Sequence, residues 1–354
     1  MVEITRIGMD TSKRVFQRHG VDASEQPVVR RKLRRRDVVT FFGKLAPTRI
    51  GLEACGGSHY WARELGALGH EVVLIPAQYV RPYVDRGKND AADAEAICEA
   101  MSRPKVAKRF AAVKAVEQQA GQMLIGVRDG LVDRRTQVSN RIRGYAVEFG
   151  LVAPKGLAHL EPLLERIAAD RTLPELVRDL FAMLDGQYRH VSAQIREIEA
   201  KLMAFHRASG LSRRLVAVPT IGPVIAAALA AKVPDPRRFR SGRDFAAWIG
   251  LTPKDHSTGG KTRLGGITRA GDEKLRSLLV CGATAVINHV RRCPTGAPPW
   301  LASLVGRKPP KLAAVALANK TARIAWKMMV TGEAYDPHRH GTPHEPAAAL
   351  AEVA

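Results

Sequence analysis

Four carboxylates occur in settings that predict a single acidic site. Asp10 closes an extended pattern at residues 7–10, and Glu53 closes a second one at residues 50–53. Asp90 and Asp93 stand three apart in an alanine-rich segment that favours a helix, so they share one helix face. If the two extended segments are neighbouring strands, Asp10 and Glu53 lie at one edge of a sheet. We therefore expect the four acids to converge.

Such a cluster predicts a bound divalent cation. Like charges held together cost free energy unless a cation neutralises them, and carboxylates are ligands for Mg²⁺ or Mn²⁺. Two such ions stabilise both the attacking and the leaving oxygen of a phosphoryl transfer. Each acid taken alone also has a structural explanation, as a turn former, a surface residue, a helix N-cap or a partner of the helix dipole. Three nearby acids are alternative ligands: Asp85, Glu95 and Glu99.

A second reactive candidate lies in the glycine-rich segment at residues 250–266. Its glycines admit a phosphate close to the backbone, where Lys261 and Arg263 would hold it. Ser257 becomes a nucleophile only if a base removes its proton, and the adjacent His256 is too constrained to be assumed that base. The residues alone favour a phosphate-binding loop over a catalytic serine.

Alternating patterns predict the elements that must position these side chains. Residues 4–10, 15–21 and 26–32 are typical of strands, followed by a helix near 37–45, a strand at 49–54, a helix at 60–68 and a strand at 71–75. Three strands joined by short turns fit an antiparallel meander, and the later helical crossovers fit parallel additions to it. This order predicts a ribonuclease-H-like mixed sheet with helices.

The rest of the chain is predicted to be mainly helical. Residues 111–149 and 173–206 have the spacing of long amphipathic helices, which form either an antiparallel hairpin or dimerisation arm, or else a plain linker packed on its own domain. Residues 216–226 place a Pro-x-Ile-Gly turn between two apolar helices. That turn indicates a helix-hairpin-helix-like element in which Gly222 lets a phosphate approach a helix N-terminus, or else a simple turn between core helices. Residues 251–272 are expected to be a long loop before an apolar helix at 275–287.

Net charge favours a polyanionic partner. The 354 residues hold 56 Lys and Arg against 34 Asp and Glu, a formal charge of +22, and aromatic residues make up only 5%. Backbone contacts to nucleic acid are therefore favoured over base stacking. The densest run has six cations in seven residues, which either bind phosphates or protect an exposed strand edge: Arg30, Arg31, Lys32, Arg34, Arg35 and Arg36.

Other classes are excluded by what the sequence lacks. No run of about 20 apolar residues is present, so a membrane span is not expected. The N-terminus has no apolar core of a signal peptide, and the four cysteines form no zinc pattern. We expect a cytoplasmic protein with reduced cysteines.

Four blocks in order resemble one known family. G-M-D-T-S-K at residues 8–13, G-L-E-A-C-G-G at 51–57, K-N-D-A-A-D-A-E-A at 88–96 and P-K-D-H-S-T-G-G-K-T-R-L-G-G-I-T-R-A-G-D at 253–272 resemble the DEDD transposases of bacterial insertion sequences, the "IS one-ten" family. The resemblance extends from about residue 5 to residue 330. It implies a RuvC-like catalytic domain over residues 1–108, a helical coiled-coil arm over 109–210, a C-terminal transposase domain over 211–335 and a flexible tail over 336–354.

The resemblance also implies roles for the candidate residues. Asp10, Glu53, Asp90 and Asp93 would be the metal-binding tetrad, and Ser257 the nucleophile that forms a phosphoserine with DNA. The family often has two serines before the glycine, whereas this chain has Ser257 followed by a threonine, so a shifted alignment would select Thr258.

The family's partners follow from the same resemblance. They are DNA at the element ends and the target, a structured non-coding guide RNA that pairs with both, and further copies of the chain in a dimer or tetramer whose protomers share the two centres. Base selection would then belong to the RNA. Two other functions stay open: a RuvC-like junction-resolving nuclease that uses the carboxylates alone, and a non-catalytic nucleic-acid-binding scaffold.

Overall fold

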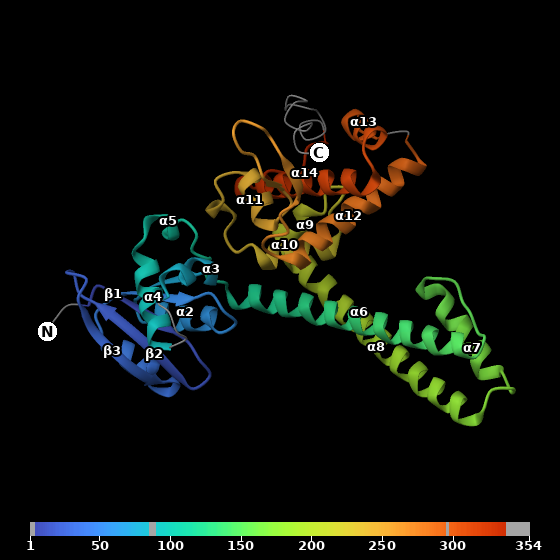
Figure 1. Ribbon diagram of the computed structural model, residues 1–354, viewed down its shortest axis with the longest axis horizontal. Helices are drawn as coiled ribbons and strands as arrows, with labels where there is room; N and C mark the ends of the chain where they lie inside the picture. The colour runs from blue at the N-terminus through green and yellow to red at the C-terminus, as the bar shows by residue number, and fades with distance from the viewer. Residues whose placement is uncertain (1–3, 85–89, 295–296, 338–354) are drawn as a thin grey trace. The chain divides into compact units, whose positions relative to one another are not determined.

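The computed structural model describes residues 4–84, 90–294 and 297–337. Two compact units divide the chain, Met1–Ala115 and Val116–Ala354 (Figure 1). The finer domain boundaries expected at residues 108, 210 and 335 stay predictions. The expected tail falls outside the described residues from residue 338 onward. No helix in the described parts of the chain is long and apolar enough to cross a membrane.

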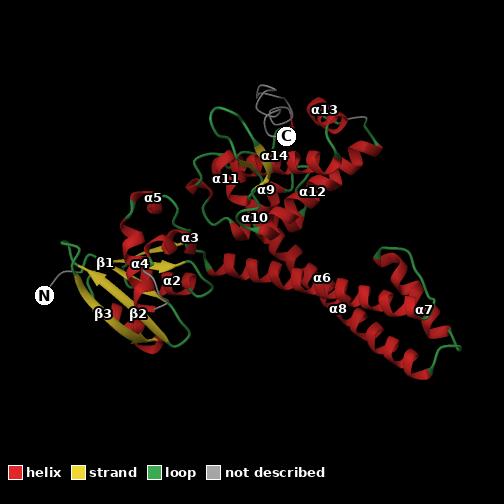
Figure 2. Cartoon of the chain, viewed as in Figure 1, coloured by secondary structure: helices red, strands yellow, loops and turns green. Residues whose placement is uncertain are grey.

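The first unit is built on a five-stranded mixed sheet. Its strands are β1 (Arg6–Asp10), β2 (Val15–Val21), β3 (Pro27–Arg34), β4 (Arg49–Glu53) and β5 (Glu71–Ile75), in the order β3-β2-β1-β4-β5. The first three strands are antiparallel neighbours, and β4 and β5 run parallel to β1. The predicted mixed sheet with helices is confirmed, and β3 is an edge strand (Figure 2).

Helices cover both faces of this sheet. One face carries Ile7, Met9 and Phe16, which pack with Trp61 of α2 (Ser58–Ala67) and with α1 (Val38–Phe42). The opposite face packs against α4 (Asp90–Ser102), and Gly8 of β1 leaves room for that helix. The remaining short helices of the unit are η1 (Arg35–Asp37), α3 (Ala77–Val80), η2 (Arg81–Tyr83) and α5 (Pro104–Ala107).

Two long helices form an antiparallel hairpin in the second unit (Figure 1). They are α6 (Val116–Glu148) and α8 (Glu175–Ala208), with η3 (Leu157–His159) and α7 (Leu160–Ala169) between them. Val191, Ile195 and Leu202 of α8 are buried, as their spacing predicts. The first long helix begins later than expected, because Ala111 instead adds a backbone bridge to Leu74 at the edge of the sheet.

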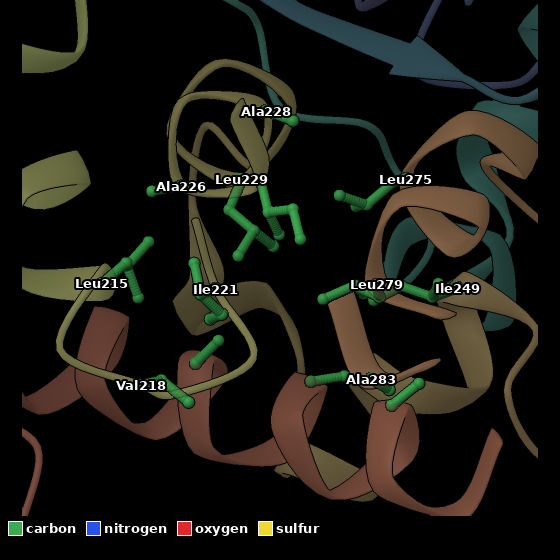
Figure 3. Close-up of a cluster of buried hydrophobic side chains, with 14 of the residues drawn as sticks. Leu215, Val218, Ile221, Ala226, Ala228, Leu229, Ile249, Leu275, Leu279 and Ala283 are labelled. Carbon is green, nitrogen blue, oxygen red and sulfur yellow. The ribbon is translucent and has the colours of Figure 1, made fainter. Parts of the chain in front are cut away.

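The C-terminal part of the second unit has one apolar core, shown in Figure 3. Leu229, Ile249 and Leu279 belong to it and come from three different helices. The helices of this part are α9 (Gly210–Leu215), α10 (Pro223–Lys232), η4 (Pro236–Arg238), α11 (Gly242–Ile249), α12 (Glu273–Arg292), α13 (Pro299–Arg307) and α14 (Pro310–Thr331).

The segment at residues 251–272 is not the plain loop that we expected. It contains an antiparallel hairpin of β6 (Pro253–Asp255) and β7 (Leu264–Ile267). A bridge between Thr258 and Lys261 closes its tip, where Gly259 and Gly260 adopt positive φ angles of 56° and 75°. Only glycine adopts such angles without strain, so the two glycines that indicated a flexible loop instead build a tight turn.

Candidate active site

The four candidate carboxylates come from two strand ends and one helix start. Asp10 is the last residue of β1, and Glu53 is the last residue of β4. The two strands are parallel and register Met9 with Leu52, so Asp10 and Glu53 are neighbours at the same edge of the sheet. Asp90 and Asp93 lie in the first turn of α4.

Three of the four acids meet closely. Asp10, Asp90 and Asp93 each offer a carboxylate oxygen within 4.8 Å of the other two. Glu53 stands outside that group but within electrostatic reach, since its charge raises the pKa of Asp10 and Asp93 raises its own. The structure thus forms a triad with Glu53 beside it, where the sequence suggested four equal members.

The electrostatics of the cluster fit a cation. Burial, followed by repulsion from Asp93, Asp90 and Glu53, raises the pKa of Asp10 to about 6. Burial and Asp93 likewise raise the pKa of Glu53, with Arg81 opposing them. No lysine or arginine among the described residues forms an ion pair with the triad. Within the described parts of the chain its charge is therefore not compensated by an ion pair, and carboxylate oxygens are the donors that Mg²⁺ prefers.

The alternative acids have other partners. Glu95 accepts a hydrogen bond of 2.9 Å from Arg30 and lies 3.9 Å from the ring of His19. Glu99 of α4 pairs with Arg103, which follows the end of that helix. Asp85 lies outside the described residues. Because Glu95 and Glu99 are already paired with cations, the two are weaker candidates for metal ligands than the triad.

Ser257 lies in the exposed turn of the β6–β7 hairpin and is held on both sides. Its backbone N–H donates to Asp255 Oδ1 over 2.8 Å, and its Oγ accepts from the backbone N–H of Arg263 over 3.1 Å. Hydrogen bonding from Ser257 also lowers the pKa of Asp255. No hydrogen bond joins the imidazole of His256 to this hydroxyl within the described residues. Asp255 is therefore the titratable side chain that contacts the serine.

Thr258 and Lys261 complete the turn. They exchange backbone hydrogen bonds across it, and their side chains are exposed together with that of Arg263. Lys261 and Arg263 are both exposed at the turn, and their binding of a phosphate stays a prediction. Ser257 and Thr258 are adjacent in the turn, and both residues are exposed.

Arg276 anchors the base of this hairpin and is a residue that the sequence analysis missed. It is only 8% exposed and donates to the backbone oxygens of Ile249 and Ala270 over 2.9 and 2.8 Å. Asn319 adds a hydrogen bond to Leu251 O over 3.1 Å. An arginine in an amphipathic helix normally indicates a solvated face, so its type and spacing gave no signal of this role.

The cationic run occupies the edge strand β3 and the turn of η1 that follows it. All six cations are exposed, and the strand's alternation divides them between the two faces of the sheet. A groove of about 680 Å³ lies along β2, β3 and the start of α4 and is lined by residues that include His19, Arg30, Arg31, Lys32, Asp90 and Glu95. The metal-binding candidate Asp90 thus borders a basic groove.

Gly222 is the N-cap residue of α10. Its backbone is extended, with a φ angle of −83° and a ψ angle of 175°, and a side chain there would meet nothing within 4 Å. The position is open to a ligand, but the conformation does not require glycine.

Comparisons with known proteins agree with one another. Residues 212–296 match the family described as "Transposase IS116/IS110/IS902 family", and residues 7–149 match the DEDD family of the same group, described as "Transposase". The y4pF/y4sB protein of Sinorhizobium fredii is 61% identical over 94% of this chain and 86% of its own length. The transposase for insertion sequence element IS1328 of Yersinia enterocolitica is 36% identical over 95% of this chain and 99% of its own. The transposase for insertion sequence element IS1111A of Coxiella burnetii is also 36% identical, over 95% and 92%.

Proposed function

The chain belongs to the IS110/IS116 family of transposases, and we propose that it cuts and rejoins DNA strands of an insertion sequence through two centres, a metal-bound acidic cluster and a serine nucleophile. The observation that carries this proposal is the triad of Asp10, Asp90 and Asp93 at the carboxyl end of β1. An uncompensated acidic cluster in a DNA-processing enzyme is suited to metal-assisted phosphoryl transfer.

Asp10, Asp90 and Asp93 would hold Mg²⁺ or Mn²⁺, and Glu53 would complete the tetrad from the adjacent strand. The bound metal supplies positive charge to the oxygens of the reacting phosphate. The protein's own contribution is rigid placement: the β1 and β4 ends are fixed by their register, and α4 is fixed against β1. Placement of this kind stabilises a transition state without reorganisation during the reaction.

Ser257 would attack a DNA phosphate through Oγ. A bond forms between Oγ and phosphorus, and one phosphorus–oxygen bond of the DNA backbone breaks. The proton lost from the Ser257 hydroxyl is balanced by the one that the leaving oxygen takes up, so the released DNA end leaves as a hydroxyl. A second transfer from phosphoserine to another DNA hydroxyl restores the serine and rejoins the strand. Asp255 orients the hydroxyl, and Lys261 and Arg263 supply positive charge near the phosphate.

The two centres lie in separate compact units, so their meeting is itself part of the proposal. Following the family resemblance, we propose that they meet across protomers of a homo-oligomer and that a structured guide RNA selects the DNA sequences. The charge of +22 supports a nucleic-acid-rich assembly of this kind, because DNA and RNA together supply the compensating charge.

The test is denaturing electrophoresis of purified protein incubated with Mg²⁺, co-expressed RNA and labelled element-end and target DNA. We expect a covalent protein–DNA band with the wild type and none with Ser257→Ala or Asp10→Ala, both of which should still bind nucleic acid. Ser257→Thr and Thr258→Ala distinguish the two adjacent hydroxyls. Free nicked DNA from both wild type and Ser257→Ala, with no adduct, would instead support a nuclease that uses the carboxylates alone.

Sharing of centres between protomers has its own test. Asp10→Ala and Ser257→Ala are each expected to be inactive alone. If the centres meet across protomers, mixing the two variants assembles sites in which an intact acidic cluster faces an intact serine, and recombination returns in part. Continued inactivity of the mixture, with mixed oligomers verified by a tag on one variant, would place both centres in one protomer.

A further inference from the structure

One face of the sheet carries a row of side chains that leads away from the acidic triad. The register pairs Asp10 of β1 with Gln17 of β2, and Gln17 with Lys32 of β3. Directly opposed residues project from the same face of a sheet, so Lys32 shares the face of Asp10. With strands about 4.8 Å apart, the Lys32 backbone lies about 10 Å from that of Asp10. A long lysine side chain spans much of that interval.

A second row runs beside the first and ends in Arg30. It pairs Gly8 with His19, and His19 with Arg30. The β2 and β3 members of these two rows and the start of α4, Asp90 included, line the groove of about 680 Å³. Arg31 projects from the other face of β3, where its charge acts on Arg18, whose guanidinium lies 3.6 Å from the centre of the Phe41 ring. Arg18 and Arg31 also border the groove. Of the cationic run in β3, Arg30 and Lys32 are the groove-lining cations that share the sheet face of Asp10.

Arg30 is held by Glu95 across this groove. The two side chains are joined by the 2.9 Å hydrogen bond, and they are 59% and 50% exposed. Exposed ion pairs contribute about 0–1 kcal/mol, so a stronger acceptor displaces such a partner at little cost. A phosphate offers Arg30 a bidentate, charge-assisted contact of that stronger kind. The imidazole of His19 also lines the groove, with its side chain only 7% exposed and its Nδ1 at 3.9 Å from Glu95 Oε2.

We propose that this groove is a subsite for the sugar-phosphate backbone of the DNA strand being cut, with Lys32 and Arg30 as its phosphate ligands and Glu95 as a clamp that releases Arg30 when a phosphate binds. The inference rests on the proposed function in one respect: it takes the strand in the groove to be the strand whose phosphate reaches the acidic triad. The row geometry places the backbone of Lys32 about 10 Å from that of Asp10, within reach of a strand bound at both positions. The groove thus orients the DNA strand, and the acidic triad acts on its phosphate.

The experiment measures binding of a fluorescein-labelled single-stranded DNA of about 20 nucleotides to the full-length protein in EDTA across a salt series. Each lost phosphate contact lowers the slope of log affinity against log salt by about 0.7 for single strands. We expect that loss for Lys32→Ala and for Arg30→Ala. Lys44→Ala, which removes the same charge from an exposed position outside the groove, is expected to retain the wild-type slope.

A substitution of Glu95 gives a second measurement, in which DNA binding is expected to become tighter. Glu95→Gln removes the competitor for Arg30 and is expected to tighten binding about two- to fivefold. The double variant Arg30→Ala/Glu95→Gln should bind no better than Arg30→Ala, because the clamp acts only through Arg30. All these positions are exposed and substitutions there leave the core intact, which melting curves verify.

Three outcomes would overturn the inference. Equal slope losses from Lys32→Ala and Lys44→Ala would show that net charge alone matters. Unchanged or weaker binding by Glu95→Gln would remove the clamp. Slope losses seen with an RNA of the same length and absent with DNA would assign the groove to RNA. Because these measurements contain no divalent metal, they report on the groove even if Asp10 or Ser257 proves dispensable for recombination.

Discussion

Gly8→Ala tests how tightly the acidic cluster depends on the contact between α4 and β1. A Cβ atom at Gly8 would lie 2.2 Å from the Ala94 carbonyl oxygen, 2.4 Å from the Cys98 nitrogen and 2.8 Å from the Cys98 Cβ. Real Cβ contacts are at least 3.0 Å, so the helix must move away from the strand by about 0.8 Å. The obstructing atoms are mainly backbone, which does not yield as a flexible side chain does.

The displacement acts directly on the site. Ala94 follows Asp93 in α4, whereas Asp10 stays with β1, so the movement separates the triad members. A misplacement of about 1 Å can lower a rate about 10²-fold. Overpacking of this kind also costs about 1–3 kcal/mol of stability. We therefore expect Gly8→Ala to lose about 10²-fold in recombination while remaining folded at 25 °C.

The assay is the covalent-adduct time course, with circular dichroism melting and DNA binding on the same samples. Gly51→Ala is the matched control on the neighbouring strand, where a new Cβ would meet the Met101 sulfur at 3.0 Å and the Ile97 Cγ2 at 3.1 Å. These are side-chain atoms that can shift, so Gly51→Ala should lose less than about tenfold. Near wild-type adduct formation by a folded Gly8→Ala protein would refute the reasoning.

Three further predictions concern charge and anchoring. Burial and the neighbouring acids raise the pKa of Asp10 to about 6, above its ordinary value of 3.8, so its ionisation destabilises the metal-free fold as pH rises from about 4 to 6. Asp10→Asn should therefore melt higher than wild type in EDTA at pH 7 and lose that advantage at pH 4, and a lower melting temperature at pH 7 would contradict this. Arg276→Met leaves two backbone carbonyls without their buried donor. The free energy of unfolding, measured by urea titration, should fall by about 1–3 kcal/mol per carbonyl. Unchanged stability would mean that water replaces the guanidinium. Asp255→Asn keeps an acceptor for the Ser257 backbone N–H but replaces the carboxylate, whose pKa the hydrogen bonds from Ser257 lower, with a neutral amide. Adduct formation should therefore slow about five- to tenfold, and an unaltered time course would limit Asp255 to shaping the turn.

The sheet was predictable because its signals are local. Alternating segments joined by short turns force an antiparallel meander, and helical crossovers force the parallel additions, which together give the order β3-β2-β1-β4-β5. The ends of parallel neighbours then coincide, so Asp10 and Glu53 could be placed side by side from sequence. Only the pairing of β1 with β4 had to be assumed.

The details of the site depend on contacts that sequence patterns do not encode. Gly8 allows α4 to approach β1 closely. This close approach brings Asp90 and Asp93 to Asp10, while Glu53 stays slightly apart. A glycine in a strand signals only a weakened strand or a close approach, without naming the neighbour. Strand periodicity alone could have divided the cationic run between the two faces of the sheet. The run was instead interpreted as one block of charge, without regard to the alternation.

The β6–β7 hairpin, which carries Ser257, also has a structure that its sequence pattern does not predict. Its glycines, hydroxyls and cations have the composition of a flexible loop, yet Gly259 and Gly260 close a turn, and the buried guanidinium of Arg276 fixes its base. Both reactive groups are therefore held rigidly inside their own units before DNA arrives. Rigid placement lowers the cost of reaching the transition state only when the two units are brought together, so binding of nucleic acid and assembly of protomers become the steps at which this enzyme would be controlled. Under the proposed mechanism, strand cleavage is withheld until the correct complex forms, because neither the acidic cluster nor the β6–β7 hairpin with Ser257 carries both halves of the chemistry.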